Sequence, residues 1–474
     1  MRKITVKEIL EATGGQLLQG SMEGAVRGAS IDSREVTAEN GFFPMKGARV
    51  DGHDFLKGAV ERGCRTLVIS DAAKVPGKEI LAGMGIMKDD VNVILVDDTL
   101  KALQQLAKYY IARLPLKKKI AVTGSVGKTS TRDMLYYVAS MKYKTGRNRK
   151  NYNNEFGLPL TILDFDDDLE VAVLEMGMDS FGEIDLLADM VRPDMAVITN
   201  VGISHIENLG SREGIRKAKM EVTNYFTEDA VLVVNQACDL LQKEMVAGNY
   251  RVVTVGNDGK SDFIVSNVCD FGDKGIKYTL DRNHTQYEVS LPVPGAHNAL
   301  NATLAIAAGE ILGIAAEDAI RGLETAQLTA KRLNIRGKNG IKVIDDTYNA
   351  APESMKSAIN TLKATKGIRR VAILSDMKEL GPESQRFHRE IGAYVAEQKI
   401  DFLVTVGSDA RFIGEGAAEA ENGLGRDSVR HFTTKAAFLK ELDQYIRPGD
   451  VVLVKGSRSM EMEEIVKKIF EDKE

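Results

Sequence analysis

One stretch of the chain, KIAVTGSVGKTSTRDM at residues 119–134, limits the possible folds more than any other. The β-prone residues 119–122 lead into a turn that contains Gly124 and Gly127, and a helical pattern begins near Lys128. Glycines allow a tight loop whose backbone N–H groups point at an anion, and the following helix adds the positive end of its dipole. A strand, a glycine loop and a helix in this order predict a phosphate-binding site.

The residues around the second glycine indicate a nucleoside triphosphate with a metal ion. Lys128 would reach the terminal phosphates, and the hydroxyl of Thr129 would bind Mg²⁺. The glycines are separated by two residues rather than the usual four, so the standard Walker spacing is not met. A glycine turn that merely precedes a helix is the alternative, and the flanking strand and helix favour the nucleotide site. The predicted nucleotide ligands in this loop are Gly124, Ser125, Gly127, Lys128, Thr129 and Ser130.

Length and composition narrow the class of protein. A chain of 474 residues should form about three domains. The net charge of -5 argues against general attraction to nucleic acid or anionic lipid. Cys64, Cys238 and Cys269 match neither a disulfide framework nor a zinc pattern, so we expect small buried thiols in a reducing compartment. No run resembles a signal peptide or a membrane span, and we therefore expect a cytoplasmic enzyme.

The first predicted domain, residues 1–98, is a small α/β unit with short strands at 66–70 and 93–96. Within it, Ser33 and Arg34 offer a hydroxyl and a planar cation, which suit a diphosphate or the edge of a uracil ring. A solvated loop is the open alternative for this pair.

In the second predicted domain, residues 99–330, short β-branched runs alternate with helical patterns. This alternation argues for a mostly parallel sheet with helices on both faces, and ligands in such folds lie at the carboxyl ends of the strands. A hairpin turning at residues 281–283 should follow. The expected parallel strands are 119–122, 171–174, 195–199, 230–234 and 252–255.

Two of these strand ends carry residues suited to a metal ion. Glu175 follows one strand directly, and His205 comes shortly after another. With Thr129 they could complete a Mg²⁺ site. A lone histidine is more often structural, and its place after a strand is what favours His205. Lys217 and Lys219, in contrast, look like a solvated helix face on composition alone.

Two amide groups are further candidates. Asn153 and Asn154 lie in an amide-rich loop that suits a polar ligand, although such loops are common without one. Asn298 and Asn301 open an apolar helix and could meet an adenine edge, and N-capping explains Asn298 equally well.

The third predicted domain, residues 331–474, repeats the alternation of strands and helices and reads as a Rossmann-like, doubly wound unit. Polar residues follow three of its strands, at 345–349, 375–381 and 455–458. Three such ends on one sheet predict a binding crevice.

Taken together, the motifs resemble the Mur ligase family along nearly the whole chain, and the short phosphate loop is the form that family uses. The most similar members add D-alanyl-D-alanine to UDP-N-acetylmuramoyl-tripeptide in peptidoglycan synthesis, with ATP and Mg²⁺. A related ligase for a single amino acid, or of the folylpolyglutamate type, is the alternative, and a nucleotide-dependent switch is a rival from another class. The motifs are TGSVGKTST, NYNNEFGLP, LEMGM, ITNVGISHIENLGS, KAKMEV, PGAHNALNA, DDTYNAAPESM, SDMKELG and VKGSRSME.

The resemblance implies a UDP-sugar domain, a central ATPase domain and a C-terminal domain that brings the amine, in a chain we expect to be monomeric. It implies an acyl phosphate formed from ATP and then attacked by the amine. Ala351 and Arg132 depart from the family pattern, which has asparagine and lysine there. The implied roles are UDP binding for Ser33 and Arg34, sugar-peptide binding for Asn153 and Asn154, metal binding for Glu175 and His205, a carbamylated lysine at Lys219, adenine contacts for Asn298 and Asn301, a γ-phosphate contact for Arg332, and third-domain contacts for Asp346, Tyr348 and Asn349.

Overall fold

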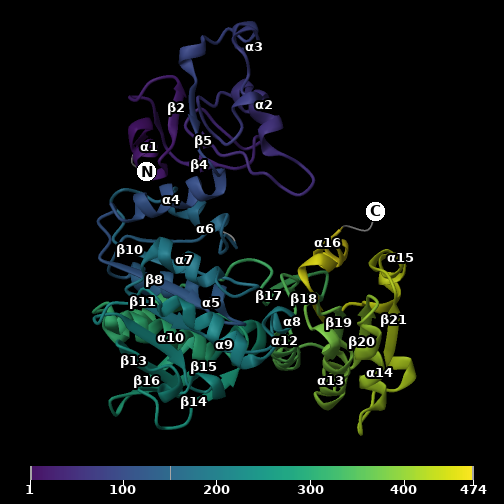
Figure 1. Ribbon diagram of the computed structural model, residues 1–474. Coiled ribbons are helices and arrows are strands. Elements are labelled where there is room, and N and C mark those ends of the chain that lie inside the picture. The colour runs from purple at the N-terminus through teal and green to yellow at the C-terminus, as the bar shows by residue number, and fades with distance from the viewer. Residues whose placement is uncertain (1–2, 150, 472–474) are drawn as a thin grey trace. The chain divides into compact units, whose positions relative to one another are not determined.

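The computed structural model describes residues 3–149 and 151–471, which form two compact units of α/β structure (Figure 1). The first unit comprises Met1–Ala121, Tyr143–Gly177 and Glu183–Asp194, and the second comprises Val122–Lys142, Met178–Gly182 and Met195–Glu474. The expected α/β class is confirmed. The boundaries of the three predicted domains stay predictions.

The N-terminal part of the first unit is built on a five-stranded sheet in the order β2-β7-β6-β5-β4. Only the β2 and β7 pair is antiparallel. The two strands expected here are present to within one residue. The sheet strands are β2 (Gln16–Gln19), β4 (Ala29–Ser30), β5 (Gly41–Phe42), β6 (Thr66–Ile69) and β7 (Asn92–Leu95), and the other elements are β1 (Ile4–Thr5), α1 (Val6–Thr13), β3 (Ala25–Val26), α2 (Leu56–Glu61) and α3 (Lys78–Gly83).

The remainder of the first unit carries Glu175. Strand β10 (Val171–Glu175) is buried at all five positions and pairs in parallel with β9 (Thr145–Arg147). Helix α4 (Thr99–Ile111) begins after Asp98, whose carboxylate accepts two N–H groups of the first turn. Helices α6 (Gly157–Ile162) and α7 (Glu183–Val191) complete it.

The second unit contains the phosphate loop. Strand β8 (Lys118–Thr123) ends there, and α5 (Lys128–Ser140) begins at the residue expected from the sequence. Helix α5 packs against α10 (Asn298–Ile311) and α11 (Ala316–Glu324). The strands pair in parallel from β11 to β14 and antiparallel from β14 to β16. They are β11 (Met195–Ile198), β12 (Val231–Asn235), β13 (Arg251–Gly256), β14 (Phe263–Asp270), β15 (Ile276–Arg282) and β16 (Thr285–Leu291), and α8 (Ile206–Leu209) and α9 (Arg212–Met220) lie between β11 and β12 in the chain.

The turn of the β15–β16 hairpin begins two residues later than expected and shares Asn283 with the expected turn. Arg282 pairs with Thr285, so the turn consists of Asn283 and His284, with φ of +51° and +64°. Two left-handed residues make the turn type whose twist matches the strands, and asparagine tolerates that backbone well.

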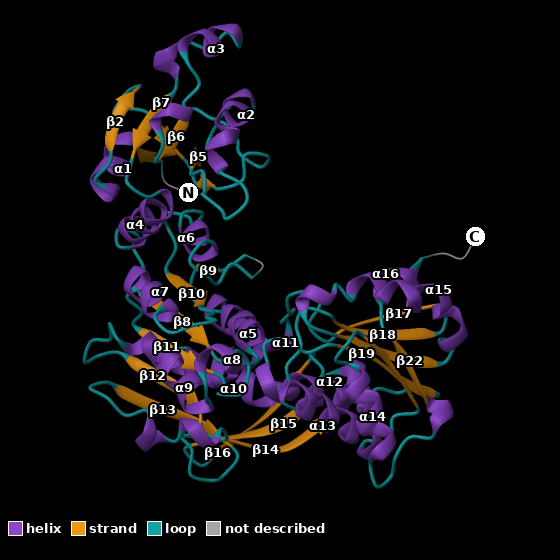
Figure 2. Cartoon of the chain, turned by 45° about the vertical axis from the view of Figure 1, so that its right-hand side comes forward, coloured by secondary structure: helices purple, strands orange, loops and turns teal. Residues whose placement is uncertain are grey.

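The C-terminal part of the second unit is a six-stranded sheet with helices on both faces (Figure 2). Helices α12, α13 and α14 contribute to the apolar core on one face, and α15 and α16 to the core on the other. The doubly wound pattern is confirmed, although α14 and the edge strands β17 and β21 were not expected. The sheet order is β17 (Asn334–Lys338), β18 (Ile341–Asp346), β22 (Asp450–Lys455), β19 (Arg369–Ser375), β20 (Phe402–Val406) and β21 (Val429–Phe432), and the helices are α12 (Pro352–Ala364), α13 (Ser384–Glu397), α14 (Arg411–Glu419), α15 (Lys435–Tyr445) and α16 (Glu463–Phe470).

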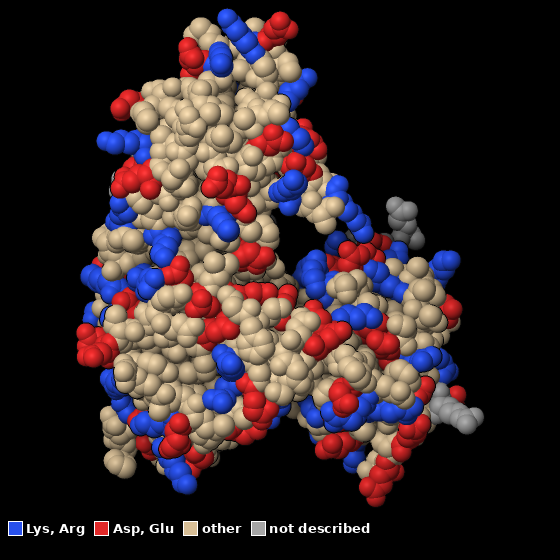
Figure 3. Space-filling view, in the orientation of Figure 1, with Lys and Arg blue, Asp and Glu red and all other residues tan. Residues whose placement is uncertain are grey.

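Basic and acidic side chains are interspersed on the face drawn in Figure 3, in keeping with the small net charge. The cysteine expectation is wrong in part, because Cys64 is buried while Cys238 is half-buried and Cys269 is exposed. Among the described residues, no helix has the length and apolar character needed to cross a membrane.

Candidate functional site

The phosphate loop requires its two glycines. Gly124 has φ of +146°, and a Cβ there would lie 1.9 Å from Thr199 Oγ1. Gly127 has φ of +86°, and a Cβ there would lie 3.0 Å from Asn301 Oδ1. A side chain at either position would be strained, and at Gly124 it would also collide with Thr199, whereas at Gly127 it would make a tight contact with Asn301. The loop is therefore held closely against the end of β11 and against α10.

Asn200, at the end of β11, supports the loop from outside. Its carbonyl accepts the Ser125 N–H at 3.0 Å, and its Oδ1 accepts the Val126 N–H at 2.9 Å. The Ser125 hydroxyl accepts the Gly202 N–H at 2.9 Å. Sequence reasoning missed this role, and the only signal was that Asn200 directly follows a strand.

The first turn of α5 presents the groups expected to meet phosphate and metal. Lys128 lies back across the loop and donates from Nζ to the carbonyls of Gly124 and Ser125, at 2.7 and 3.1 Å. Thr129 is buried, and its hydroxyl has no hydrogen-bond partner among the described residues. A buried hydroxyl without a partner is costly, and a metal ion would satisfy it.

Lys219, on α9, is only 2% exposed, so its interpretation as part of a solvated helix face is wrong, whereas Lys217 is exposed as expected. Burial, together with the charge of Lys128, lowers the pKa of Lys219 well below its ordinary value. Within the part of the chain that the structure describes, this amine has no hydrogen bond or ion pair. The lowered pKa favours the neutral amine, which is the form of lysine that reacts with electrophiles.

Glu175 and Asn153 are brought together in the first unit. Asn153 Nδ2 donates to Glu175 Oε1 at 2.8 Å, and the Glu175 N–H donates to Asn148 Oδ1 at 2.6 Å. Asn154 Oδ1 instead accepts the Gly157 N–H at 2.9 Å and shapes the loop before α6. Asn148 was not predicted as part of this group.

Arg34 is exposed and pairs with Asp32, with 2.6 Å between Nη2 and Oδ2. Hydrogen bonds from the side chain and the backbone of Arg34 lower the pKa of Asp32 to about 2. The ion pair between Arg34 and Asp32 is compatible with a UDP-binding site and with a solvated loop, so both interpretations of Ser33 and Arg34 stay predictions.

Asn298 is not the N-cap of α10, because His297 occupies that position. Asn298 is buried; its Nδ2 donates to the Pro294 carbonyl at 2.8 Å, and its Oδ1 accepts Asn301 Nδ2 at 2.9 Å. The amide of Asn301 in turn lies beside Gly127 of the loop.

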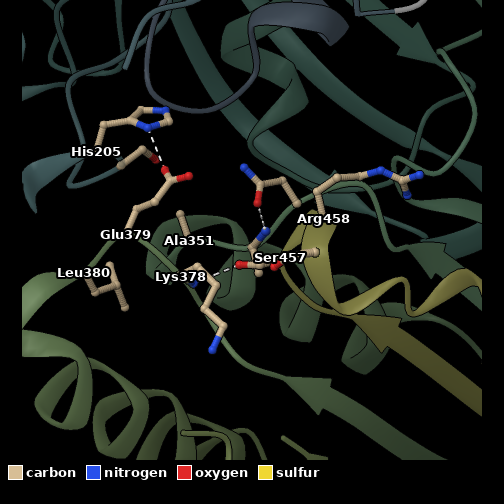
Figure 4. A pocket seen from close by; sticks show the side chains of 11 residues that line it. His205, Ala351, Lys378, Glu379, Leu380, Ser457 and Arg458 are labelled. Atoms are coloured by element: carbon tan, nitrogen blue, oxygen red, sulfur yellow. Dashed lines mark hydrogen bonds and ion pairs between the residues drawn. The ribbon is translucent and has the colours of Figure 1, made fainter. Parts of the chain in front are cut away.

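His205 faces carboxylates in the second unit. Its Nδ1 lies 2.6 Å from Glu379 Oε2 (Figure 4) and 3.2 Å from Asp179 Oδ1. The hydrogen bond to His205 lowers the pKa of Glu379. Across residues 3–149 and 151–471, no cluster of three His, Cys, Asp or Glu is arranged to hold a metal ion. The combination of Thr129, Glu175 and His205 therefore stays a prediction.

The expected crevice in the C-terminal part of the chain is confirmed. A cavity of about 350 Å³ is lined by residues from all three polar segments that follow strands, including Asn349, Lys378 and Ser457 (Figure 4). His205 also lines it. The Lys378 N–H donates to Ser457 Oγ at 2.9 Å, which joins two of these ends.

Two buried residues hold the loop that carries Lys378: Asp376, which lies in the predicted polar segment 375–381, and His388, which was not predicted. Asp376 accepts the N–H groups of Asp409 and Ala410 and, at 2.8 Å, Lys378 Nζ. His388 accepts the Met377 N–H at Nε2, at 3.0 Å, while Nδ1 bonds the Ser384 carbonyl at 2.7 Å. His388 must therefore carry its proton on Nδ1.

Arg332, Tyr348 and Asp346 meet at the end of β18. The Arg332 guanidinium lies 4.2 Å from the centre of the Tyr348 ring, and its buried Nε has no hydrogen-bond partner among the described residues. Asp346 accepts Lys455 Nζ at 2.5 Å and the Leu333 N–H at 3.2 Å.

A tight phosphate loop, a buried amine near its lysine and a separate polar crevice define a nucleotide-phosphate-binding α/β protein with a second ligand site. Family models agree: "Mur ligase family, catalytic domain" matches residues 25–111, "Mur ligase middle domain" 122–309, and "Mur ligase, glutamate ligase domain" 331–458. The chain belongs to the Mur ligase family.

Individual relatives match along nearly their whole length. UDP-N-acetylmuramoyl-tripeptide–D-alanyl-D-alanine ligase of Bacillus subtilis is 40% identical over 474 residues, 99% of each chain. Among solved structures, MurF from Acinetobacter baumannii gives a TM-score of 0.87 at 31% identity, covering 100% of both chains. MurF ligase from Thermotoga maritima in complex with ADP gives 0.79 at 28% identity, covering 94% of this chain and 97% of the other.

Proposed function

We propose that this chain is an ATP-dependent ligase that joins D-alanyl-D-alanine to UDP-N-acetylmuramoyl-tripeptide in peptidoglycan precursor synthesis. The observation that carries the proposal is the match, over 99% of both chains, to the Bacillus subtilis enzyme of that name. The tight phosphate loop supports the ATP part, and so does the ADP complex of the Thermotoga maritima relative. We also propose a cytoplasmic monomer with domains at residues 1–98, 99–330 and 331–474.

The proposed reaction has two steps. The free carboxylate of the tripeptide attacks the γ-phosphorus of ATP, an oxygen–phosphorus bond forms, and ADP leaves. The amine of D-alanyl-D-alanine then attacks the carbonyl carbon, loses a proton and expels phosphate, so an amide bond forms. Lys128 and Arg332 offset the charge on the phosphate oxygens. The buried Nε of Arg332, which has no hydrogen-bond partner within residues 3–149 and 151–471, supports an anionic ligand there.

The Thr129 hydroxyl, which has no hydrogen-bond partner in the described part of the chain, suits Mg²⁺, and we propose Thr129, Glu175 and His205 as the ligands of the ion. When bound, the ion would neutralise charge on the phosphates. We propose that Lys219 is carbamylated, which its low pKa supports because only the neutral amine reacts with carbon dioxide. His205 would exchange its Glu379 partner for the ion.

The remaining assignments follow the family motifs. The polar cavity beside Lys378 and Ser457 is proposed to receive the incoming dipeptide. The nucleotide contacts are Gly124, Ser125, Gly127, Ser130, Asn298, Asn301 and Asp346, and the substrate contacts are Ser33, Arg34, Asn153, Asn154, Tyr348 and Asn349.

Substrate competition tests the proposal. The enzyme is incubated with ATP, Mg²⁺, UDP-N-acetylmuramoyl-tripeptide, D-alanyl-D-alanine and an equal concentration of single amino acids. The products are then identified by mass spectrometry. We expect the UDP-pentapeptide alone. A product extended by one residue would replace the proposal with the single-amino-acid ligase.

A further inference from the structure

The linker between α11 and β17, residues 325–333, is tied to the helix that begins at the phosphate loop. Thr329 donates both its N–H and its hydroxyl to Asp133 Oδ2, at 2.8 and 2.7 Å. Asp133 lies on α5, five residues after Lys128, about 7.5 Å along the helix axis. One carboxylate oxygen therefore fixes a residue that is 196 positions away in the chain.

The other carboxylate oxygen of Asp133 is bound by Arg132. The guanidinium donates to Oδ1 from Nε at 3.0 Å and from Nη2 at 2.5 Å, and Nη2 also donates to Thr329 Oγ1 at 2.9 Å. Asp133 is fully buried and Arg132 is 1% exposed. A buried carboxylate is stable only when its oxygens are satisfied, so the three side chains form one interdependent group.

Beyond Thr329 the chain is fixed to the C-terminal sheet within two residues. The Lys331 carbonyl accepts the Tyr348 N–H at 3.3 Å, and the Leu333 N–H donates to Asp346. Lys331 and Leu333 have φ of +65° and +48°, which are strained for these residue types. Only Ala330, which is exposed, separates the residue tied to α5 from the residues tied to β18.

We propose that Asp133, held by Arg132, is a positioning residue for the ligase reaction. By anchoring Thr329 it confines rotation of the C-terminal sheet to the backbone around Ala330 and sets where Arg332 stands relative to the phosphate loop. The inference rests on the proposed function, since it assumes that Arg332 meets the γ-phosphate.

The first test removes one hydroxyl. In Thr329→Val the kcat for ligation should fall on the order of tenfold to a hundredfold, as expected for a misplaced catalytic group. The KM for ATP should change less than about twofold, because an interaction made only in the transition state affects kcat alone. Thr329→Ser should restore kcat. Thr325→Val is the matched control, since it removes a hydroxyl of the same linker that donates to the Gly322 carbonyl of α11 rather than to Asp133.

A double-mutant cycle separates positioning from plain stability. If Asp133 acts through Arg332, Thr329→Val should cost less than about twofold further in an Arg332→Ala background. Multiplicative losses would overturn the proposal, and so would a Thr329→Val enzyme with unchanged kcat.

Amide exchange tests the anchor without any turnover. Residues 325–333 should be protected in the unsubstituted protein and should exchange faster in Asp133→Asn. If the amides of residues 325–333 exchange without protection in the unsubstituted protein, Asp133 does not anchor Thr329 and the proposal is overturned. If protection is seen but the unsubstituted protein forms no ligation product, the proposed function fails, and the role of the anchor in positioning Arg332 fails with it.

Discussion

At Gly124 the backbone and its neighbours leave no room for a side chain. We expect Gly124→Ala to cost about 2 to 4 kcal/mol, the sum of left-handed strain and a collision with Thr199. Gly259→Ala is the control, because Gly259 also has a positive φ of +73° but nothing lies within 4 Å of its added Cβ. Its cost should be about 1 kcal/mol. Thermal unfolding of both variants checks this, and equal losses would contradict the steric account.

Lys219 is the residue whose environment most clearly departs from what composition predicts. Burial, together with the charge of Lys128, lowers the pKa of Lys219, which favours the neutral amine that carbon dioxide requires. We expect Lys219→Gln to abolish ligation, and the unsubstituted protein in isotope-labelled bicarbonate to show a carbamate carbon by NMR. Lys217→Gln, on the exposed side of the same helix, should keep its activity. A fully active Lys219→Gln enzyme would exclude the carbamate role.

At the scale of elements, the loop after β19 depends on a histidine that must stay neutral. Burial lowers the pKa of His388 below its usual value of 6.5, and its Nε2 accepts the Met377 N–H only when unprotonated. As the pH falls, the unfolded chain therefore takes up a proton first. The contribution to stability is complete above pH 6.5 and is lost below it.

The lowered pKa of His388 predicts a measurable difference between the unsubstituted protein and His388→Gln. Between pH 7 and pH 5 the unsubstituted chain should lose stability faster than His388→Gln, by at most about 1.4 kcal/mol per pH unit for one proton. Denaturant titrations across this range check the difference. Parallel pH profiles for the two proteins would show that His388 does not titrate on unfolding.

Elements with strong local signals were predictable from the sequence. The strand, loop and helix around Gly124 agree with expectation because glycine positions and β-branched runs act locally. Groups assembled from distant segments were not predictable. Asn200 supports the phosphate loop across about 75 residues, and Thr329 reaches Asp133 across 196. Neither pair has a pattern that periodicity can detect.

Lys219 is a residue for which the local sequence pattern predicts the wrong environment. Charge and helical spacing predict a solvated lysine, and only the packing around α9 makes it buried. For the same reason the N-cap interpretation of Asn298 was wrong, because its amide is used by the Pro294 carbonyl and Asn301. Local sequence preference determines the burial and the hydrogen-bond partners of such residues only where tertiary contacts do not.

At the scale of the whole molecule, the proposed roles are distributed along the chain from Ser33 to the cavity residue Ser457. The phosphate loop, Arg332 and the cavity beside Lys378 belong to the second unit, and Glu175 and Asn153 belong to the first. A reaction that uses all of them requires the complete chain. We therefore propose that the whole chain carries one reaction path, ligation through an acyl phosphate, rather than a function of any single residue.

The most direct test of that claim follows an oxygen atom. The tripeptide is labelled with heavy oxygen in its free carboxylate, and the phosphate released from ATP is weighed with D-alanyl-D-alanine added or withheld. We predict that product forms only with the dipeptide, that each product is matched by one phosphate carrying one labelled oxygen, and that Lys128→Ala abolishes both. Unlabelled phosphate, or ATP turnover that is indifferent to the dipeptide, would contradict the acyl-phosphate ligase.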